Sequence, residues 1–470
     1  MERNRIETAE SWARKQFGAC KLGDRRRTER AVQLGAAILR APGKTLPQQM
    51  QSPPILKAAY RFLDEAGISY PALMQPHFEQ TRAKLRQDGE VKLLIQDLTE
   101  VDYTRYQQIE GLGPIGDGRG RGYLLSTVLA VRPQPRQVLG IAYQEPFLRV
   151  PAPEGETRTQ RAQRPKESDF WMRGVAAVGR CPAGQLWVHV GDRGSDIYDY
   201  MATCRAHNCH FLLRAYQNRK MTTPEGEVAY VIHFARRLPA LEQCVLHLAA
   251  GHGHPARDAQ VRLAFSPLTL TPSETWLNRK ARPIDAWIIR VWEVDPPPGV
   301  QEPLDWYLLT SLPVHSIAQA WERVDWYRCR WLVEDFHQCL KTGCQLEQRH
   351  LEHHDRLLRL LGLLSPVAVH LLDLREQARV EPEHLASTAV PPDLLRLVAY
   401  LTHTDPQRLS LQQFWRLVAQ LGGYQGRKRD GPAGCLCRTC WMAFTWPPIS
   451  TSEPGCLGTL CFSSSLTCFG

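Results

Sequence analysis

The sequence lacks an uninterrupted run of eighteen apolar residues, and its first residues, Met-Glu-Arg-Asn-Arg, contain no apolar stretch of the kind found in a signal peptide. The first absence argues against a membrane-spanning helix and the second argues against export. We therefore expect a cytoplasmic protein whose thiols stay reduced. The 470 residues, 43% of them hydrophobic, are enough for two to four domains with a sizeable core.

Acidic residues are in the minority, with 48 Asp and Glu against 58 Lys and Arg, which gives a net charge of +10. This balance fits a polyanionic partner, although bulk charge says nothing about the fold. Paired cysteines at metal-ligand spacing are also missing from the first 344 residues, so the eight cysteines there are interpreted as small core residues. His350, His353 and His354 have no such cysteine partners either, and we interpret them as the polar start of a helix rather than a zinc site.

The first 75 residues have the pattern of short helices. Asp24 is placed to cap a helix, and Arg25, Arg26, Arg27 and Arg30 would then fall near its first turn. Cations at this end oppose the helix dipole, a cost that an external phosphate would offset. A basic turn that simply faces solvent is the other interpretation.

The middle of the chain changes to an α/β pattern. Compact apolar strands are predicted at 90–98, 122–133 and 136–146, followed by a helix at 166–180, a strand that ends at Asp192, and a strand at 209–216. From about 217 to 303 the apolar segments alternate with Gly and Pro, and we predict a β-rich insertion there.

A strand at 304–313 is predicted to precede a long helical region. Ser316 and Gln319 form a candidate capping box, and the region would end at Gly343, with a break near Trp326 because it is long for one helix. Helices are predicted to dominate from 355 to about 423.

Two aspartates are predicted to lie where apolar strands end, namely Asp97 and Asp192. Functional groups are commonly displayed at such strand ends in α/β sheets. Each aspartate taken singly is equally compatible with an ordinary turn.

Four polar residues share one side of the predicted helix 325–343. Tyr327, Arg330, Glu334 and Lys341 fall within an arc of about 60° if the helix is continuous at 3.6 residues per turn. A solvated helix face with an incidental ion pair would give the same stripe. Together with the two aspartates, however, Glu334 completes a set of three carboxylates.

Three carboxylates could hold two magnesium ions about 4 Å apart for phosphodiester chemistry, since hard Mg²⁺ prefers anionic oxygen. One ion would activate the attacking oxygen and the other would stabilise the leaving oxygen. Arg330 and Lys341 would then stand against the negative charge of the transition state.

The spacing Tyr327, Arg330, Glu334, Lys341 resembles the YREK signature of the IS-four family of bacterial DDE transposases, and in particular the Tn-five type. Further similar segments occur in the same order over about residues 8–425: LGDRRRTER, AAYRFLDE, IQDLT, GDRGSDI, FLLRAYQNRK, WYLLTSLPVHSIAQA, EDFHQCLKTG and QLGGY.

This resemblance implies an RNase H-like catalytic core at 76–375, with a mixed five-stranded sheet and flanking helices, interrupted by the insertion at about 217–303. A helical domain at 1–75 would bind transposon ends, and 376–434 would be a helical C-terminal region. Asp97, Asp192 and Glu334 would be the catalytic triad that binds two Mg²⁺ ions, which Mn²⁺ could replace. Tyr327, Arg330 and Lys341 would hold the phosphate next to the scissile bond.

The resemblance also implies cut-and-paste transposition through a DNA hairpin, with the 3′ ends then joined to target DNA. Trp306 would stack on the flipped base, unless it is only a core residue of its strand. Arg214, Arg219 and Lys220 would contact the element's ends, although Tyr216 replaces the lysine of the family pattern. Arg26, Arg27 and Arg30 would position the end DNA. The resemblance further implies a homodimer that forms on paired ends and acts on nucleoid DNA in a bacterial cytoplasm.

Residues 435–470 depart from the family. They hold six cysteines but no Lys, Asp or His, and no helical period. Cys435, Cys437 and Cys440 could suggest zinc, but a fourth ligand is not evident. We expect a disordered tail, produced by a frameshift, in place of the dimerisation helix. The alternative function is therefore a remnant that occupies transposon ends without transposing, and a simple RNase H-like nuclease is a third candidate.

Overall fold

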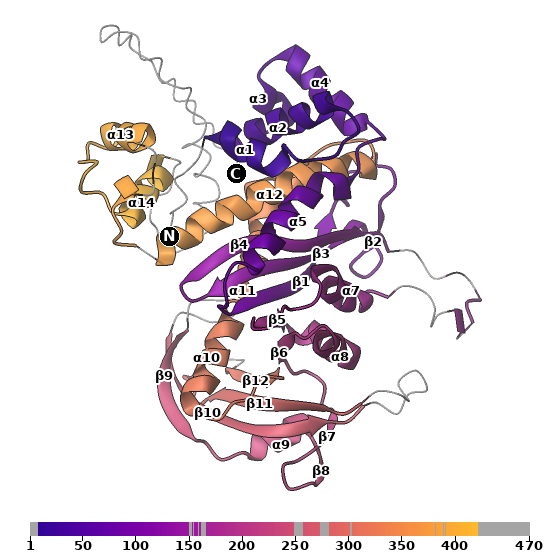
Figure 1. Cartoon of the computed structure of the whole chain (residues 1–470), viewed down its shortest axis with the longest axis vertical. Coiled ribbons are helices and arrows are strands. Elements are labelled where there is room, and N and C mark those ends of the chain that lie inside the picture. The colour runs from indigo at the N-terminus through magenta and orange to yellow at the C-terminus, as the bar shows by residue number, and fades with distance from the viewer. Residues whose placement is uncertain are drawn as a thin grey trace.

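The computed structural model describes residues 8–421, apart from 150–152, 154, 158, 161–165, 249–256, 273–281, 301–302, 381, 389 and 391. Within these residues the chain folds as a mixed α/β structure around one large sheet with helices on both faces (Figure 1). The predicted mixed α/β class is confirmed. The tail at 435–470 lies outside the described residues.

The chain begins with helices whose ends follow local capping rules. Asp24 caps α2 as predicted, because its carboxylate accepts a hydrogen bond from the amide of Arg26 at 2.7 Å. Gly35 lets α2 pack closely on α1, since a Cβ at this position would lie 2.4 Å from the ring of Phe17. These helices are α1 (Ala9–Phe17), α2 (Arg25–Arg40), α3 (Leu46–Met50), α4 (Pro53–Asp64) and α5 (Tyr70–Leu85).

The described strands form a single mixed sheet in the order β2-β3-β1-β5-β6-β12-β11-β10-β7-β8, with β4 paired to β3 and β9 paired to β10. The pairs β1–β5 and β5–β6 are parallel, and the other pairs are antiparallel. The strands are β1 (Lys92–Asp102), β2 (Gly113–Ile115), β3 (Gly120–Pro133), β4 (Arg136–Phe147), β5 (Trp187–Gly191), β6 (His210–Arg214), β7 (Lys220–Thr222), β8 (Val228–Tyr230), β9 (Glu242–Leu248), β10 (Arg257–Leu270), β11 (Ile284–Glu293) and β12 (Asp305–Thr310).

The segment predicted as a β-rich insertion, about 217–303, contributes β7 to β11 and helix α9 (Val231–Arg237). These strands do not form a separate sheet. Strand β12, which follows the segment, pairs with β6 on one side and with β11 on the other. The segment therefore extends the sheet that carries β1 and β5, a continuity that local sequence patterns do not encode.

Alternate side chains of the strands enter two different cores, as the pleat of a strand requires. Leu93 and Ile95 of β1 pack with the core that includes α11 (Trp331–Gln338) and α12 (His354–Val380). Leu94 packs with the opposite core, which includes α7 (Asp169–Val178) and α8 (Tyr198–Ala206). Burial on both faces explains why these strands are apolar runs rather than alternating patterns.

Helix α12 is long and apolar enough to cross a membrane by length and composition, with a mean hydropathy of 1.7 in its most apolar window. In this structure 83% of that window is buried, and α12 runs against α2, α5 and β4 (Figure 1). The fold therefore accounts for its apolar character as that of a core helix. The described chain continues with α13 (Pro392–Leu401) and α14 (Leu411–Leu421).

Two buried arginines fasten the N-terminal helices to the rest of the chain. Arg359 of α12 donates to the carbonyl oxygens of Ile68 at 2.6 Å and Leu63 at 2.9 Å, near the end of α4. Arg349 donates to the carbonyl oxygens of Lys44 at 2.5 Å and Pro42 at 2.8 Å. Leu63 lies in the last turn of α4, where carbonyls lack partners within the helix, and the other three carbonyls lie in the connections between helices. The two guanidinium groups satisfy these carbonyls across the joint.

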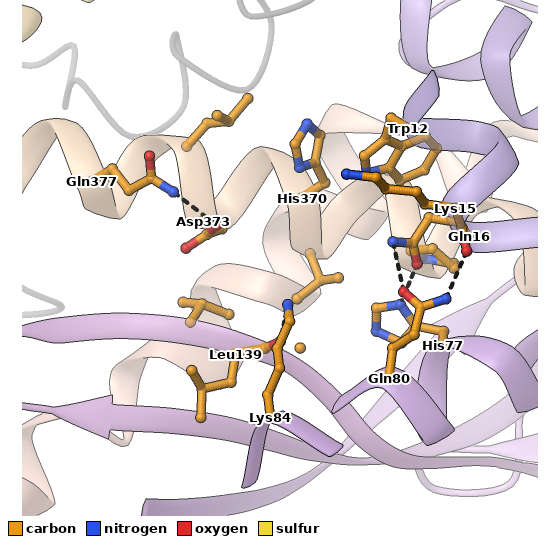
Figure 2. Close-up of a pocket in the computed structure, with 15 residues that line it drawn as sticks. Trp12, Lys15, Gln16, His77, Gln80, Lys84, Leu139, His370, Asp373 and Gln377 are labelled. Atoms are coloured by element: carbon orange, nitrogen blue, oxygen red, sulfur yellow. Dashed lines mark hydrogen bonds between the residues drawn. The ribbon is translucent and has the colours of Figure 1, made fainter. Parts of the chain in front are cut away.

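A cavity of about 220 Å³ lies in the same joint, between α1, α5, β4 and α12 (Figure 2). Lys84 reaches into it from α5, while His370 and Asp373 come from α12. Lys84 donates to the carbonyl of Leu139 at 3.0 Å, and burial raises the pKa of Asp373 to about 6. None of the residues predicted to form a functional site lines this cavity, so it belongs to the joint between the helices.

We predict that Arg359→Met lowers the free energy of unfolding by about 2–4 kcal/mol, because it leaves two buried carbonyls without donors. Arg356→Met is the matched control from the same face of α12. Arg356 pairs with Asp64 and Glu352, whose side chains are 60% and 78% exposed, so its loss should change stability by less than about 1 kcal/mol. Equal effects of the two variants in urea titrations would contradict this account of the joint.

Candidate active site

Asp97 and Asp192 are brought together by the parallel pairing of β1 and β5. Ile95 is in register with Val190, so two residues further along, Asp97 of β1 stands level with Asp192, which directly follows β5. Parallel strands run in the same direction, and residues equally far past a registered pair therefore lie side by side. The predicted meeting of these two aspartates agrees with this register.

The sequence suggested that Asp97 ends its strand, but this prediction is wrong. β1 continues to Asp102 because its antiparallel pairing with β3 persists, with Asp97 opposite Thr127. β5, in contrast, ends at Gly191, and Asp192 follows directly. Asp97 thus lies at the point where β1 loses its neighbour β5 but keeps its neighbour β3.

Asp192 sits in a tight turn whose electrostatics reflect the nearby carboxylate. Its Oδ1 accepts a hydrogen bond from the amide of Gly194 at 2.8 Å. Burial raises the pKa of Asp192, and the negative charge of Asp97 raises it further, while the amide of Gly194 and the charge of Arg330 act in the opposite direction. The two aspartates are therefore close enough for their charges to oppose each other.

The helix that was predicted to carry four polar residues is not continuous, so the helical-wheel argument for a single stripe was wrong. Helix α10 (Ile317–Arg328) is capped by Ser316, as predicted, but it ends before Arg330. Helix α11 begins at Trp331, and a π-helical turn follows at Cys339–Gly343. The break falls at 329–330 rather than near Trp326, and it places Arg330 between the two helices.

Arg330 links the helix to the strand aspartates. Its guanidinium lies 2.6 Å from the carboxylate of Glu334, and its side chain is only 9% exposed. Burial opposes the charge of Arg330, but Tyr327, Glu334 and Asp97 outweigh this effect and raise its pKa. Its buried Nε has no hydrogen-bond partner among the described residues, which leaves a donor for an incoming anion.

Lys341, which was predicted to hold a phosphate, has an acidic partner in this structure. It lies in the π-helical turn and pairs with Glu347 at 3.2 Å rather than with Glu334. Glu347 also accepts a hydrogen bond from the amide of Asp102 at 3.1 Å. The structure therefore ties Lys341 to the far end of β1, and it does not bring this lysine against the carboxylate of Glu334.

Trp306 contacts two other predicted site residues. Its ring lies edge-on to that of Tyr327, with centroids 5.4 Å apart, and the guanidinium of Arg214 is 5.9 Å from the Trp306 ring centre. Burial lowers the pKa of Arg214 and raises that of Tyr327. Trp306 itself is half-buried, and its partner Tyr327 interacts with the charges of Arg330 and Asp192.

The remaining predicted cations have other surroundings. Arg219 pairs with the buried Asp196 at 2.8 Å and so has a structural partner, while Lys220 begins β7 with an exposed side chain. In the N-terminal helices, Arg26 is exposed and Arg30 is partly exposed, whereas Arg27 pairs with Glu65 at 2.8 Å. Arg26 and Arg30 therefore remain better placed for an external ligand than Arg27.

Sequence reasoning missed His337, which lies one turn after Glu334. Its side chain is 6% exposed, and its Nδ1 is 3.5 Å from Oδ2 of Asp97. The only signal was its position three residues after Glu334, which puts both residues on neighbouring parts of the helix surface. That spacing could have suggested a residue near the carboxylates, but not which carboxylate it meets.

The donor set suits a hard divalent cation. Within the described residues, no three Asp, Glu, His or Cys side chains stand together as a metal cluster, and Glu334 contacts Arg330 instead. Asp97 and Asp192 nevertheless provide two mutually repelling carboxylates, a repulsion that an oxygen-binding cation would relieve. These two residues would be the first ligands, with Glu334 available when it leaves Arg330.

Two protein families match segments of the chain. A transposase DNA-binding family matches residues 9–68, and a transposase DDE domain matches residues 186–369. The first match covers α1 to α4 with Arg26, Arg27 and Arg30. The second begins one residue before β5 and includes Asp192 and Glu334, while Asp97 lies between the two matched segments.

We predict that Asp192→Asn raises the melting temperature at pH 7.5. A pKa raised in the folded state means that the ionised carboxylate opposes folding. The resulting loss of folding stability appears only as pH rises through the folded-state pKa. The gain should therefore shrink as pH falls toward 4. Asparagine can still accept the hydrogen bond from Gly194.

The nearby Asp196 is the matched control with the opposite expectation. It accepts hydrogen bonds from the amides of Tyr216 and Gln217 at 2.8 and 2.7 Å, and it pairs with Arg219. Asp196→Asn should lower the free energy of unfolding by about 3 kcal/mol or more, because it breaks a buried ion pair. Thermal unfolding at both pH values checks the two variants, and a destabilised Asp192→Asn protein would refute the argument.

Proposed function

We propose that this DDE transposase, which carries a DNA-binding segment and a nuclease and strand-transferase domain, moves a DNA element by cut-and-paste transposition. It binds the ends of the element, cuts them through a hairpin intermediate and joins the 3′ ends to target DNA. The observation that carries the proposal is the level placement of Asp97 and Asp192 on parallel strands, with Arg330 connecting them to Glu334.

The strand arrangement supports an RNase H-like core of the IS-four type. The five strands β4-β3-β1-β5-β6 give three antiparallel strands followed by two parallel ones, and the triad residues come from β1, the end of β5 and α11. We assign residues 76–375 to this core, 1–75 to end binding and 376–434 to a helical C-terminal region. The YREK spacing of Tyr327, Arg330, Glu334 and Lys341 fits the same assignment.

Divalent metal dependence follows from the DDE domain, and we propose Mg²⁺ as the ion, two per site, with Mn²⁺ as a substitute. Asp97, Asp192 and Glu334 would hold it. When bound there, such a metal supplies Lewis acidity to the attacking and leaving oxygens of a phosphodiester. The ion pair with Arg330 keeps Glu334 close to this position until metal and DNA arrive.

The cations and aromatic side chains would handle the DNA itself. Arg330 offers its unpaired Nε to the phosphate beside the scissile bond, with Tyr327 next to it. Lys341 would need to leave Glu347 to share this task. Hairpin formation requires a base to leave the stack, and Trp306, backed by Tyr327 and Arg214, is the proposed platform for it.

End recognition would use phosphate contacts from the first turn of α2. Arg26 and Arg30 are accessible there. Further DNA contacts would come from other cations, either after their present surroundings rearrange or where DNA passes them: Arg27, Arg214, Arg219 and Lys220.

We propose a homodimer on paired ends and a cytoplasmic location at nucleoid DNA. The atypical composition of 435–470 favours a second candidate, an end-binding remnant that forms complexes with single ends but does not pair them.

We predict that Glu334→Gln reduces DNA cleavage on the order of 10³-fold, because it removes a charged metal ligand that contributes several kcal/mol to the transition state. DNA carrying the element's own ends is incubated with Mg²⁺, and denaturing gels report nicks and hairpins. End binding, measured without metal by gel shift, should be unchanged.

Glu322→Gln is the control for Glu334→Gln, because Glu322 lies on α10 and its contact is with Arg323. It should cut like the wild-type protein. Cleavage by Glu334→Gln at the wild-type rate would remove the triad assignment. Complexes that contain only one end, together with no hairpin product from the wild-type protein, would favour the remnant.

We predict that Trp306→Ala slows hairpin formation by roughly 10- to 100-fold, because it removes a stacking platform worth about 1–3 kcal/mol per base. The first nick should persist. Trp292→Ala is the control, since Trp292 is also half-buried on the neighbouring strand but stacks with Arg290 at 4.4 Å. If both variants lose the nick and the hairpin together, Trp306 has only a structural role.

A further inference from the structure

A row of buried polar side chains leads from Asp97 across one face of the sheet to β4 and α5. His337 faces Oδ2 of Asp97 through Nδ1 at 3.5 Å, and its Nε2 lies 3.2 Å from the hydroxyl of Thr127. The amide of Gln144 donates to the same hydroxyl at 2.9 Å. The hydroxyl of Tyr70 in turn donates to Oε1 of Gln144 at 2.9 Å.

The register of three strands creates this row. Asp97 of β1 is opposite Thr127 of β3, and Thr127 is opposite Gln144 of β4. Residues in register across a sheet point to the same face, so the three side chains stand in line. His337 reaches the row from α11 and Tyr70 reaches it from the start of α5.

The row is closed to solvent. The exposed fractions are 0% for Thr127, 2% for Gln144, and 5% for both His337 and Tyr70. Buried polar groups of this kind are costly unless each has a partner, so the members hold one another in fixed orientations. Burial also raises the pKa of Tyr70 well above its ordinary value, which keeps its hydroxyl a donor.

The hydrogen bonds have one consistent direction. Tyr70 donates to the amide oxygen of Gln144, which leaves the amide nitrogen to donate to Thr127. Thr127 accepts this bond and keeps its own hydroxyl hydrogen available to donate to Nε2 of His337. With that donation, the ring proton of His337 is on Nδ1 and faces Asp97. This arrangement of hydrogen bonds favours one tautomer of the histidine.

We propose that His337 is a positioning residue that holds the carboxylate of Asp97 for metal binding, and that Thr127, Gln144 and Tyr70 set its tautomer. This inference rests on the proposed function, in which Asp97 is a metal ligand. By engaging one carboxylate oxygen, His337 limits the rotation of Asp97 and leaves the other oxygen for the ion. The separation of 3.5 Å shortens to a hydrogen bond when the site is assembled on DNA.

Thr127→Val and Thr127→Ser form the decisive pair, because valine keeps the shape of threonine but lacks the hydroxyl, whereas serine keeps the hydroxyl but lacks the methyl group. Thr127→Val removes the donor that sets the tautomer and should raise the Mn²⁺ concentration for half-maximal cleavage by about 10- to 100-fold. Thr127→Ser should stay close to wild type. The second readout is the rise in melting temperature caused by Mn²⁺ without DNA, which should shrink in Thr127→Val alone.

Variants of His337 and of Tyr70, at the far end of the row, provide the remaining tests. His337→Leu should lose the Mn²⁺ response, and His337→Asn should recover part of it, because its amide nitrogen occupies the place of Nδ1. Tyr70→Phe, which removes one hydroxyl from a helix end, should shift the Mn²⁺ requirement in the same direction by less. End binding without metal should be unchanged in every variant, which separates positioning from a general loss of fold.

The outcomes distinguish this inference from the function on which it rests. A wild-type protein without any Mn²⁺-dependent change in melting temperature or cleavage would overturn both. A responsive wild-type protein with an equally responsive Thr127→Val variant would overturn the role of His337 and leave the triad intact. Equal losses in Thr127→Val and Thr127→Ser would also overturn it, since the hydroxyl would then not matter.

Discussion

The parallel pairing of β1 with β5 is the constraint on which the candidate site depends. Two residues past the last registered pair, Ile95 and Val190, it sets Asp97 and Asp192 side by side. Their charges oppose each other, and the pKa of Asp192 is raised by burial and by Asp97. The folded chain therefore carries an unfavourable interaction that a divalent cation would relieve, which is the electrostatic condition expected of a metal-dependent site.

Arg330 joins this strand pair to the helical side of the site. Because the helix breaks just before α11, Arg330 leaves the regular surface of α10 and becomes buried between Tyr327 and Glu334. It forms an ion pair with Glu334, and its charge also acts on Asp97 and Asp192. The same guanidinium has a buried Nε without a hydrogen-bond partner among the described residues, so one side chain both pairs with Glu334 and keeps an unused donor.

The surrounding architecture keeps these groups in place from both sides. The sheet continues from β6 through β12 into β11 and β10, so the strand that carries Trp306 belongs to the same hydrogen-bonded sheet as β1 and β5. On the other side, Arg349 and Arg359 fasten the N-terminal helices to the segment around α12. The segment that matches the transposase DNA-binding family and the segment that matches the DDE domain are thus joined through buried arginine–carbonyl contacts.

The sequence by itself determined the residue types and the local structure: the apolar strands, the caps at Asp24 and Ser316, the mixed α/β class and the transposase resemblance. These follow from short-range periodicity and capping chemistry, which neighbouring residues decide. Only the tertiary structure decided that β1 runs past Asp97, that the helix breaks at 329–330, and that Lys341 and Arg219 pair with Glu347 and Asp196. It also decided that His337 meets Asp97. The physical reason is that strand pairing and buried ion pairs join residues far apart in the chain, and a local pattern contains no information about which distant partner a side chain will meet.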